Sequence, residues 1–427
     1  MSSESSLSHL PTELLISISR HLCAHCYGDP HEPSRGVQAL ARLCRTSKAF
    51  YLVAAPILYH ELPPYGAAHT FRFLLTLSVK PHLANYVRRA RLTGNDWDSG
   101  GDDWWDDWFE EASPEQQDML RIAFRIFGVV LPDTSSNEGV QEIDECHSVA
   151  MRELVSRAKF LEHVMIISSA PMEFSDREAQ AWEAFSSKPD ILSNLRILER
   201  GYDYHRGGFC LSDSNTSLEG FIFAAAPKLE SLLLQKCSEI SLHSIYPAIT
   251  VVKLTYSNLT MTDLTELLQH LPALQDFTYE SGGLAINYER EGTEHTPAEV
   301  TTCLRSRAAT LQHISLDYSN WDYSNCNGPL ENELLVGSFS DFPVLRRLEL
   351  NSENIFLASP AVSEGQLVSI LPQSLEGLEI KGCCPPSACT SLAAAAASGQ
   401  FPLLKEVTFW YSGRTRFSRA EIVSRHM

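Results

Sequence analysis

Cysteine and histidine residues gather near the N-terminus at spacings that metal sites use. Cys23 and Cys26 are separated by two residues, as zinc-binding thiols often are, and a neutral imidazole can complete a tetrahedral set of ligands. The nearby imidazoles belong to His21, His25 and His31. No matching CxxC or HxxxH pair follows further along the chain. We therefore interpret these residues as incidental to an inserted loop, and we predict no metal site and no cofactor.

A second distinctive segment mixes tryptophan with carboxylates. Residues 96–111 read DWDSGGDDWWDDWFEE. Two interpretations stay open. The favoured one packs the tryptophans against the chain and leaves the carboxylates in water. In the other, a projecting loop holds a basic substrate segment through Trp104 and Trp105, since tryptophan is enriched at binding hot spots and carboxylates steer cationic partners.

Motifs of common enzymes are absent. The sequence contains no GxxxxGK[ST], GxGxxG, HExxH or GxSxG motif. With 15 histidines and 53 acidic residues, isolated pairs of titratable residues arise by accident and define no site. We expect a non-catalytic protein, and the alternative of an enzyme with a site hidden in its αβ segment stays open.

The N-terminal cysteines and histidines lie between short helical segments. Residues 10–22 read LPTELLISISRHL, and residues 38–62 read QALARLCRTSKAFYLVAAPILYHEL. Leu14, Ile18 and Leu22 recur at every fourth position and so share one stripe of a helix. Residues 23–37 are expected to loop out, because their glycines and prolines break any helix. A segment this short is marginal alone, so we expect a partner to complete it.

The N-terminal segment resembles a known docking domain. LPTELL, followed by LCRTSKAF and AAPILYHEL, is similar to the F-box of filamentous-fungal proteins. The resemblance implies docking to a Skp-type adaptor, which links the chain to a cullin. The alternative is that these helices cap the next domain. The family's adaptor-binding positions fall on Leu10, Pro11, Leu14, Leu15, Ile18, Leu43, Cys44, Phe50 and Leu58.

Beyond residue 60, a short unit with apolar residues at positions 1, 4 and 6 recurs ten times, and in one copy Arg200 takes the place of the apolar residue at position 6. Positions 4 and 6 of a strand point the same way, so they are expected to face inward, and parallel stacking of such strands closes a core. Helical segments at 262–271, 296–311, 363–372 and 391–400 separate some of the units. This alternation predicts a right-handed α/β arrangement. The units begin at Val87, Leu161, Leu195, Leu229, Ile249, Leu274, Leu311, Leu345, Leu375 and Leu404.

The unit resembles the leucine-rich repeat, in which Asn or Cys follows LxxLxL. Cys237, Asn258 and Cys383 stand roughly there. Because the starts from Leu161 onward lie 20 to 37 residues apart, the repeats are irregular, and unrelated αβ layers are the alternative. The predicted fold class is α/β, with a three-helix F-box followed by a leucine-rich-repeat-like solenoid. The predicted domains are an F-box at 8–62, a solenoid at 65–412 with an insert at about 95–145, and a tail at 413–427, which is either disordered or caps the last repeat.

The composition of the chain restricts the classes of partner and the cellular compartments that we expect. The formal net charge of −19 disfavours binding to nucleic acid or to anionic membranes. No apolar run of about 18 residues occurs, so no membrane span is expected. The first residues show no secretory signal, and the eleven cysteines have no disulfide-framework spacing. A cytoplasmic or nuclear protein with reduced thiols is expected.

These observations predict the substrate-recognition subunit of a Skp-cullin-F-box ubiquitin ligase. The strand-lined face is expected to contact a protein substrate whose identity the sequence does not give. A repeat-based interaction scaffold that delivers nothing to a ligase is the alternative. The candidate substrate-binding residues are Trp104, Trp105, Lys253, Asp276, Glu349 and Glu379.

Overall fold

A computed structural model of the chain groups into two compact units. Unit 1 comprises Met1–Ser168, Met172–Glu199 and Phe221–Lys228, and unit 2 comprises Ser169–Pro171, Arg200–Gly220 and Leu229–Met427. The structure describes residues 10–23, 26, 33–61, 73, 75–77, 79–93, 118, 155–167, 180, 182–184, 191–201, 208–214, 217–282, 295–319, 335–356, 365–382, 384–410 and 414–418.

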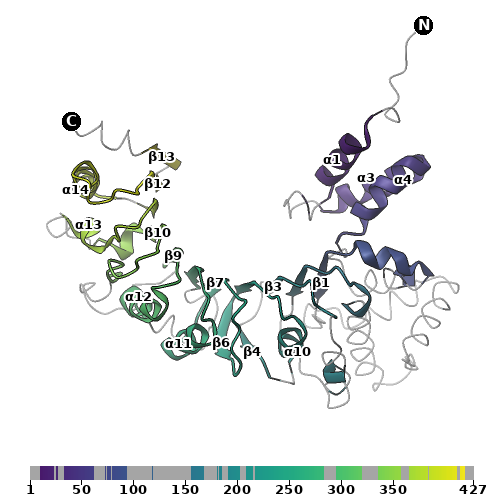
Figure 1. The fold of residues 1–427 in the computed structure, drawn as a ribbon, viewed down its shortest axis with the longest axis horizontal. Coiled ribbons are helices and arrows are strands. Elements are labelled where there is room, and N and C mark those ends of the chain that lie inside the picture. The colour runs from purple at the N-terminus through teal and green to yellow at the C-terminus, as the bar shows by residue number, and fades with distance from the viewer. Residues whose placement is uncertain are drawn as a thin grey trace, which may run out of the picture. The chain divides into compact units, whose positions relative to one another are not determined.

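Unit 1 begins with three helices that lie together (Figure 1). They are α1 (Thr12–His21), α3 (Pro33–Thr46) and α4 (Lys48–Leu58). Pro11 caps α1, and its carbonyl accepts the N–H groups of Leu14 and Leu15. Ser47 caps α4 by accepting the N–H of Phe50 at 3.2 Å. Helices are therefore present within residues 10–62 as predicted, and local hydrogen bonds fix the first turns of α1 and α4.

The start of α3 differs from the prediction. Residues 23–37 were expected to form a loop, but α3 begins at Pro33 and continues through Gly36. Proline fits the first turn of a helix, since its missing N–H would have no partner there. Gly36 is tolerated because it packs closely against α1: a Cβ at this position would collide with the carbonyl oxygen of Leu22. The expectation of a loop is therefore wrong for residues 33–37, because Pro33 suits the first turn of α3 and the close contact with Leu22 requires glycine at position 36.

Replacing Gly36 with alanine is expected to destabilise the three helices. The added methyl group would meet backbone atoms of Leu22, so α1 and α3 must separate, at a cost of about 1–3 kcal/mol. Thermal unfolding of the full chain and hydrogen exchange in α1 measure the change. Gly377→Ala is the control, because its Cβ would meet only ordinary contacts at 3.6 Å or more. Equal exchange in α1 of the wild type and Gly36→Ala would contradict the expectation.

The rest of unit 1 carries the first strands. A 3₁₀ helix at Pro81–Tyr86 precedes β1 (Arg89–Thr93), which pairs in parallel with β2 (His163–Ile167). Strand β3 (Ile197–Gly201) follows in the sheet order, and its residues are divided between the two units after Glu199. Helix α10 (Leu218–Ala225) contributes residues to both units.

Unit 2 contains a mostly parallel sheet whose strand order follows the chain. Strand β5 pairs in parallel with β7, each strand from β7 to β12 pairs in parallel with the next, and β13 pairs antiparallel with β12. Within the tail predicted at 413–427, residues Arg414–Ser418 therefore form an edge strand beside β12. The strands are β5 (Ser231–Gln235), β7 (Val251–Ser257), β8 (Asp276–Ser281), β9 (His313–Asp317), β10 (Arg347–Asn351), β11 (Gly377–Lys381), β12 (Glu406–Trp410) and β13 (Arg414–Ser418).

The sheet of unit 2 aligns the predicted apolar positions. Position 4 of one unit stands opposite position 4 of the next, as Phe277 does to Ile314. Positions 1, 4 and 6 are buried throughout, apart from the half-buried Phe409. The α/β class with a mostly parallel sheet is confirmed. The aligned position-4 residues are Leu232, Val252, Phe277, Ile314, Leu348, Leu378 and Val407.

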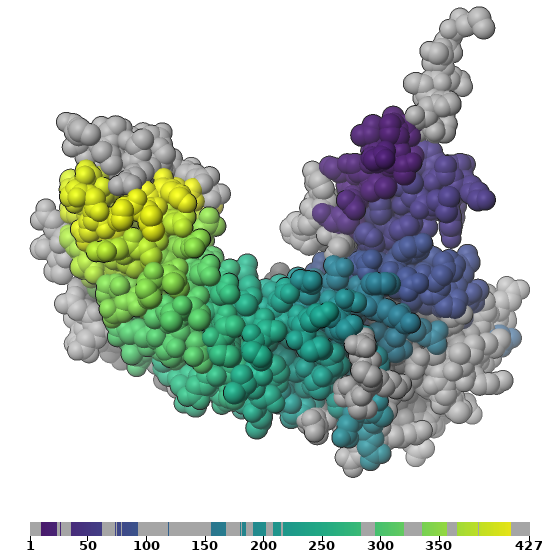
Figure 2. Space-filling model, viewed as in Figure 1, coloured from purple at the N-terminus to yellow at the C-terminus, as the bar shows by residue number. Residues whose placement is uncertain are grey.

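Helices lie along one side of the strands of unit 2 (Figure 1). Helix α12 starts with the predicted capping box, in which Thr296 and Glu299 exchange hydrogen bonds, and α11 has a similar box from Thr260 and Asp263. A separate parallel pair joins β4 (Phe209–Ser212) to β6 (Cys237–Ser241). In Figure 2, the coloured residues from β5 (teal) to β12 (yellow) form one uninterrupted surface. The helices are α11 (Met261–His270), α12 (Pro297–Leu304), α13 (Gln366–Ile370) and α14 (Pro386–Ala397).

Candidate functional site

The three N-terminal helices share a small core of their own. Cys23, Leu40, Ala54 and Ile57 form its buried centre. More apolar side chains pack around this centre from all three helices. They are Ile16, Leu22, Leu43, Cys44 and Leu58.

Large apolar side chains on the same helices face outward. Leu14 and Ile18 on α1 are 51% and 46% exposed, and Leu52 on α4 is 65% exposed. Val37 on α3 and Tyr51 on α4 are also exposed. Single exposed apolar residues are common on protein surfaces, but five on helices of this size supply area that a partner can cover.

The predicted adaptor-binding residues divide into two groups. Pro11, Leu14 and Ile18 are exposed, and Leu10 and Phe50 are half-buried. The others face the interior of the helices: Leu15 is buried, and Leu43, Cys44 and Leu58 pack against the helical core. The exposed part of the predicted stripe is therefore Leu14 and Ile18 on α1, whereas Leu22 packs with the inward residues that hold the helices together.

The predicted substrate-binding residues of unit 2 all lie on the outward positions of the sheet. Lys253 is exposed, and Asp276, Glu349 and Glu379 are half-buried. Glu349 and Glu379 are direct cross-strand partners in β10 and β11. The structure thus places these four residues on one sheet, in strands β7, β8, β10 and β11. Trp104 and Trp105 lie outside the described residues.

His313 joins two of these carboxylates. Its Nδ1 lies 3.1 Å from Oδ1 of Asp276, and its Nε2 lies 3.3 Å from Oε1 of Glu349. Burial by itself would lower the pKa of His313, but the hydrogen bonds with Asp276 and Glu349 raise that pKa to about 9. His313 is therefore a cation at neutral pH, held between two anions. Sequence reasoning missed it, because one histidine on a strand carries no signal until its neighbours are known.

A second group of charges lies beside this one. Lys381 Nζ is 3.2 Å from Oδ2 of Asp317, whose other oxygen accepts a hydrogen bond from Asn351 at 2.8 Å. Burial raises the pKa of Asp317, but hydrogen bonds from Ser319 and the cation of Lys381 outweigh it and leave the pKa lowered. Opposite charges thus neutralise one another along this face.

Unit 1 has a comparable cluster on β1 to β3. Arg89 lies 3.1 Å from Glu199 and 3.6 Å from Glu61, and His163 lies 2.8 Å from Glu199. Burial works against ionisation of Glu199, but His163 and Arg89 leave its pKa lowered. Paired, partly buried charges of this kind suit recognition of a polar partner. They present no nucleophile joined to a base in the geometry of acyl transfer.

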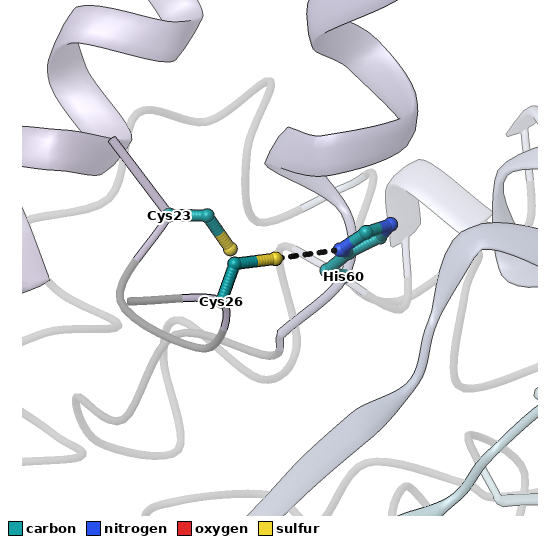
Figure 3. Close-up of side chains that lie close together, drawn as sticks. All are labelled: Cys23, Cys26 and His60. Atoms are coloured by element: carbon teal, nitrogen blue, oxygen red, sulfur yellow. Dashed lines mark hydrogen bonds between the residues drawn. The ribbon is translucent and has the colours of Figure 1, made fainter. Parts of the chain in front are cut away.

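One cluster in unit 1 brings two thiols and an imidazole together (Figure 3). The ligating atoms of Cys23, Cys26 and His60 all lie within 4.8 Å of one another, and Cys26 Sγ is 3.6 Å from His60 Nδ1. Partial burial of its sulfur and the adjacent Cys23 raise the pKa of Cys26 to about 12. His60 was not among the histidines that the sequence suggested, because it lies 34 residues beyond Cys26. Of those, His21 Nδ1 lies 2.8 Å from the Ser17 carbonyl, while His25 and His31 lie outside the described residues.

Neither protein-family models nor curated proteins match the sequence of this chain. In the part of the chain that the structure describes, no helix has both the length and the apolar character needed to cross a membrane. The function is therefore inferred from the chain's own residues and their geometry.

Proposed function

We propose that the chain is the substrate-recognition subunit of a Skp-cullin-F-box ubiquitin ligase and performs no chemistry itself. In this proposal, helices α1, α3 and α4 dock to a Skp-type adaptor that joins the chain to a cullin. A leucine-rich-repeat-like solenoid holds the protein substrate. Holding that substrate beside a ubiquitin-loaded enzyme raises its effective concentration, which accelerates transfer without a catalytic residue in this chain.

The observation that carries the proposal is the exposed apolar stripe on α1. Leu14 and Ile18 point to solvent although the same helices bury a core of their own. Both residues belong to the LPTELLISI segment that resembles an F-box. Covering each of these side chains stabilises a complex by about 1.5–3 kcal/mol. A protein that covers this stripe would remove both side chains from water.

The sheet of unit 2 supports the second half of the proposal. Its strands follow chain order, keep their position-4 residues opposite one another and bury the apolar positions of the recurring unit. Lys253 and the carboxylates of Glu349 and Glu379 stand on the outward positions. A broad face of polar side chains on rigid strands suits a folded or extended protein segment better than a small molecule.

Replacing Leu14 and Ile18 together with aspartate is expected to abolish capture of a purified Skp-type adaptor. Two exposed apolar contacts are lost and two charges enter the interface, so affinity should fall about 100-fold or more. Both side chains are about half exposed, so the helices should stay folded. Titration calorimetry measures binding, and circular dichroism measures helix content.

Leu403→Asp is the matched control, since Leu403 is also 51% exposed but lies in unit 2. It should bind the adaptor as the wild type does. Undiminished binding by the double variant would refute the F-box assignment. Recovery of the adaptor without a cullin would favour the interaction scaffold. Proteins that accumulate in cells whose chain lacks residues 8–62 would identify the substrate.

A further inference from the structure

The Cys23–Cys26 segment is shaped by backbone hydrogen bonds rather than by chance proximity. The N–H of Cys23 donates to Arg20 at 3.1 Å, so Cys23 continues the last turn of α1. The N–H of Cys26 then donates to the carbonyl of Cys23 at 3.1 Å, which closes a turn between the two cysteines. This turn brings both thiols to the same side (Figure 3).

The imidazole reaches the thiols from a different element. His60 follows α4, and its N–H donates to the Ile57 carbonyl at 3.2 Å. Its own carbonyl accepts the N–H groups of Arg88 and Arg89, both at 2.9 Å. The backbone of His60 is thus anchored on both sides, and Nδ1 is held towards Cys26.

The separations suit a tetrahedral zinc ion. With Zn–S bonds of about 2.3 Å and Zn–N bonds of about 2.0–2.1 Å, ligand atoms of such a site lie about 3.5–3.8 Å apart. Cys26 Sγ and His60 Nδ1 are 3.6 Å apart, and the other pairs are within 4.8 Å. Two thiolates and an imidazole select zinc over magnesium or calcium, which prefer oxygen ligands.

We propose that Cys23, Cys26 and His60 bind one zinc ion that joins the end of α1 to the segment after α4. Cys23 is buried, whereas Cys26 is exposed, so one side of the site is open to solvent and a water molecule takes the fourth position. The three helices have a small core, and small domains commonly gain stability from a structural metal. This inference does not depend on adaptor binding.

The first test is the zinc content of the full-length protein, purified without chelator and measured by mass spectrometry of the metal. We expect one zinc ion per chain in the wild type and a loss of at least about tenfold in Cys26→Ser and in His60→Ala. Cys303→Ser and His82→Ala are the controls, because both residues lie elsewhere and should leave the zinc content unchanged. Equal zinc in wild type and Cys26→Ser would overturn the proposal.

The second test uses Co²⁺ as a spectroscopic probe of the same full chain and requires no variant to fold. Tetrahedral Co²⁺ with two thiolates is expected to give strong d–d absorption and a sulfur-to-cobalt charge-transfer band, which one equivalent of Zn²⁺ should abolish. Cobalt binding without the charge-transfer band would overturn the proposal. A disulfide between Cys23 and Cys26 in freshly purified protein, detected as a mass lower by two hydrogens, would also overturn it.

Discussion

Replacing Arg200 with leucine is expected to lower the free energy of unfolding of unit 2 by about 3–5 kcal/mol. Arg200 is 1% exposed and forms an ion pair with Glu219, which is 3% exposed. Its guanidinium also lies 4.4 Å from the ring centre of Phe209. Without the arginine, the Glu219 carboxylate is left buried without its cation. Urea unfolding, followed by calorimetry, measures the loss.

Two further variants test whether the loss of stability comes from the buried ion pair. The double variant Arg200→Leu with Glu219→Leu should recover most of the stability, because apolar residues replace a buried pair at little net cost. Arg347→Leu removes an exposed ion pair with Glu406, 3.6 Å away, and should cost no more than about 1 kcal/mol. A loss below about 1 kcal/mol in Arg200→Leu would show that the buried pair contributes as little as a surface pair.

Acidification from pH 6.5 to 4.5 is expected to destabilise the wild type by about 2–3 kcal/mol through His295 alone. His295 is fully buried, and Nδ1 lies 3.2 Å from the hydroxyl of Tyr318. Burial lowers its pKa to about 4, although the carboxylates of Glu299 and Asp263 oppose that shift. Between that value and the unfolded pKa near 6.5, only the unfolded chain binds the proton. The stability that depends on neutral His295 is therefore retained above pH 6.5. The free energy of unfolding then decreases as the pH falls below 6.5.

His295→Gln keeps a hydrogen-bonding partner for Tyr318 but does not titrate, so its stability should vary less over this range. Unfolding midpoints measured every half pH unit for both proteins give the comparison. His313→Gln is the control, because the raised pKa of His313 acts in the opposite direction. The stabilisation that protonated His313 contributes is complete below pH 6.5 and is lost as the pH rises through about 9. Parallel acid profiles for the wild type and His295→Gln would contradict the expectation.

The strands could be predicted because their signal is local. Leu348 and Leu350 lie two residues apart, and the alternation of side chains along a strand places both on the same face of the sheet. The same spacing identified Leu378 and Ile380. Arg200 occupies position 6 of its unit, which an apolar residue fills in the other nine units, and its partner Glu219 became evident only from the fold.

The parts that sequence reasoning missed depend on residues far apart in the chain. His60 reaches Cys26 from 34 residues away, and no spacing rule links them. His313 receives its carboxylates from β8 and β10, so its charge depends on strand register. Gly36 signals a loop by composition, whereas its helix is stabilised by contact with Leu22. In all three cases the deciding contact is tertiary, and at Gly36 it overrides the local preference of the residue.

The constant register of the strands also bears on how such a chain changes in length. Successive units begin 25, 37, 34, 30 and 29 residues apart between Ile249 and Leu404, yet their position-4 residues stay opposite one another. Pairing is therefore set by each strand and not by the connection before it. Duplication or deletion of one whole unit leaves every remaining strand with an equivalent neighbour, whereas the loss of a single residue inside a strand reverses its inward face. Viable insertions and deletions should accordingly fall in the connections or comprise entire units.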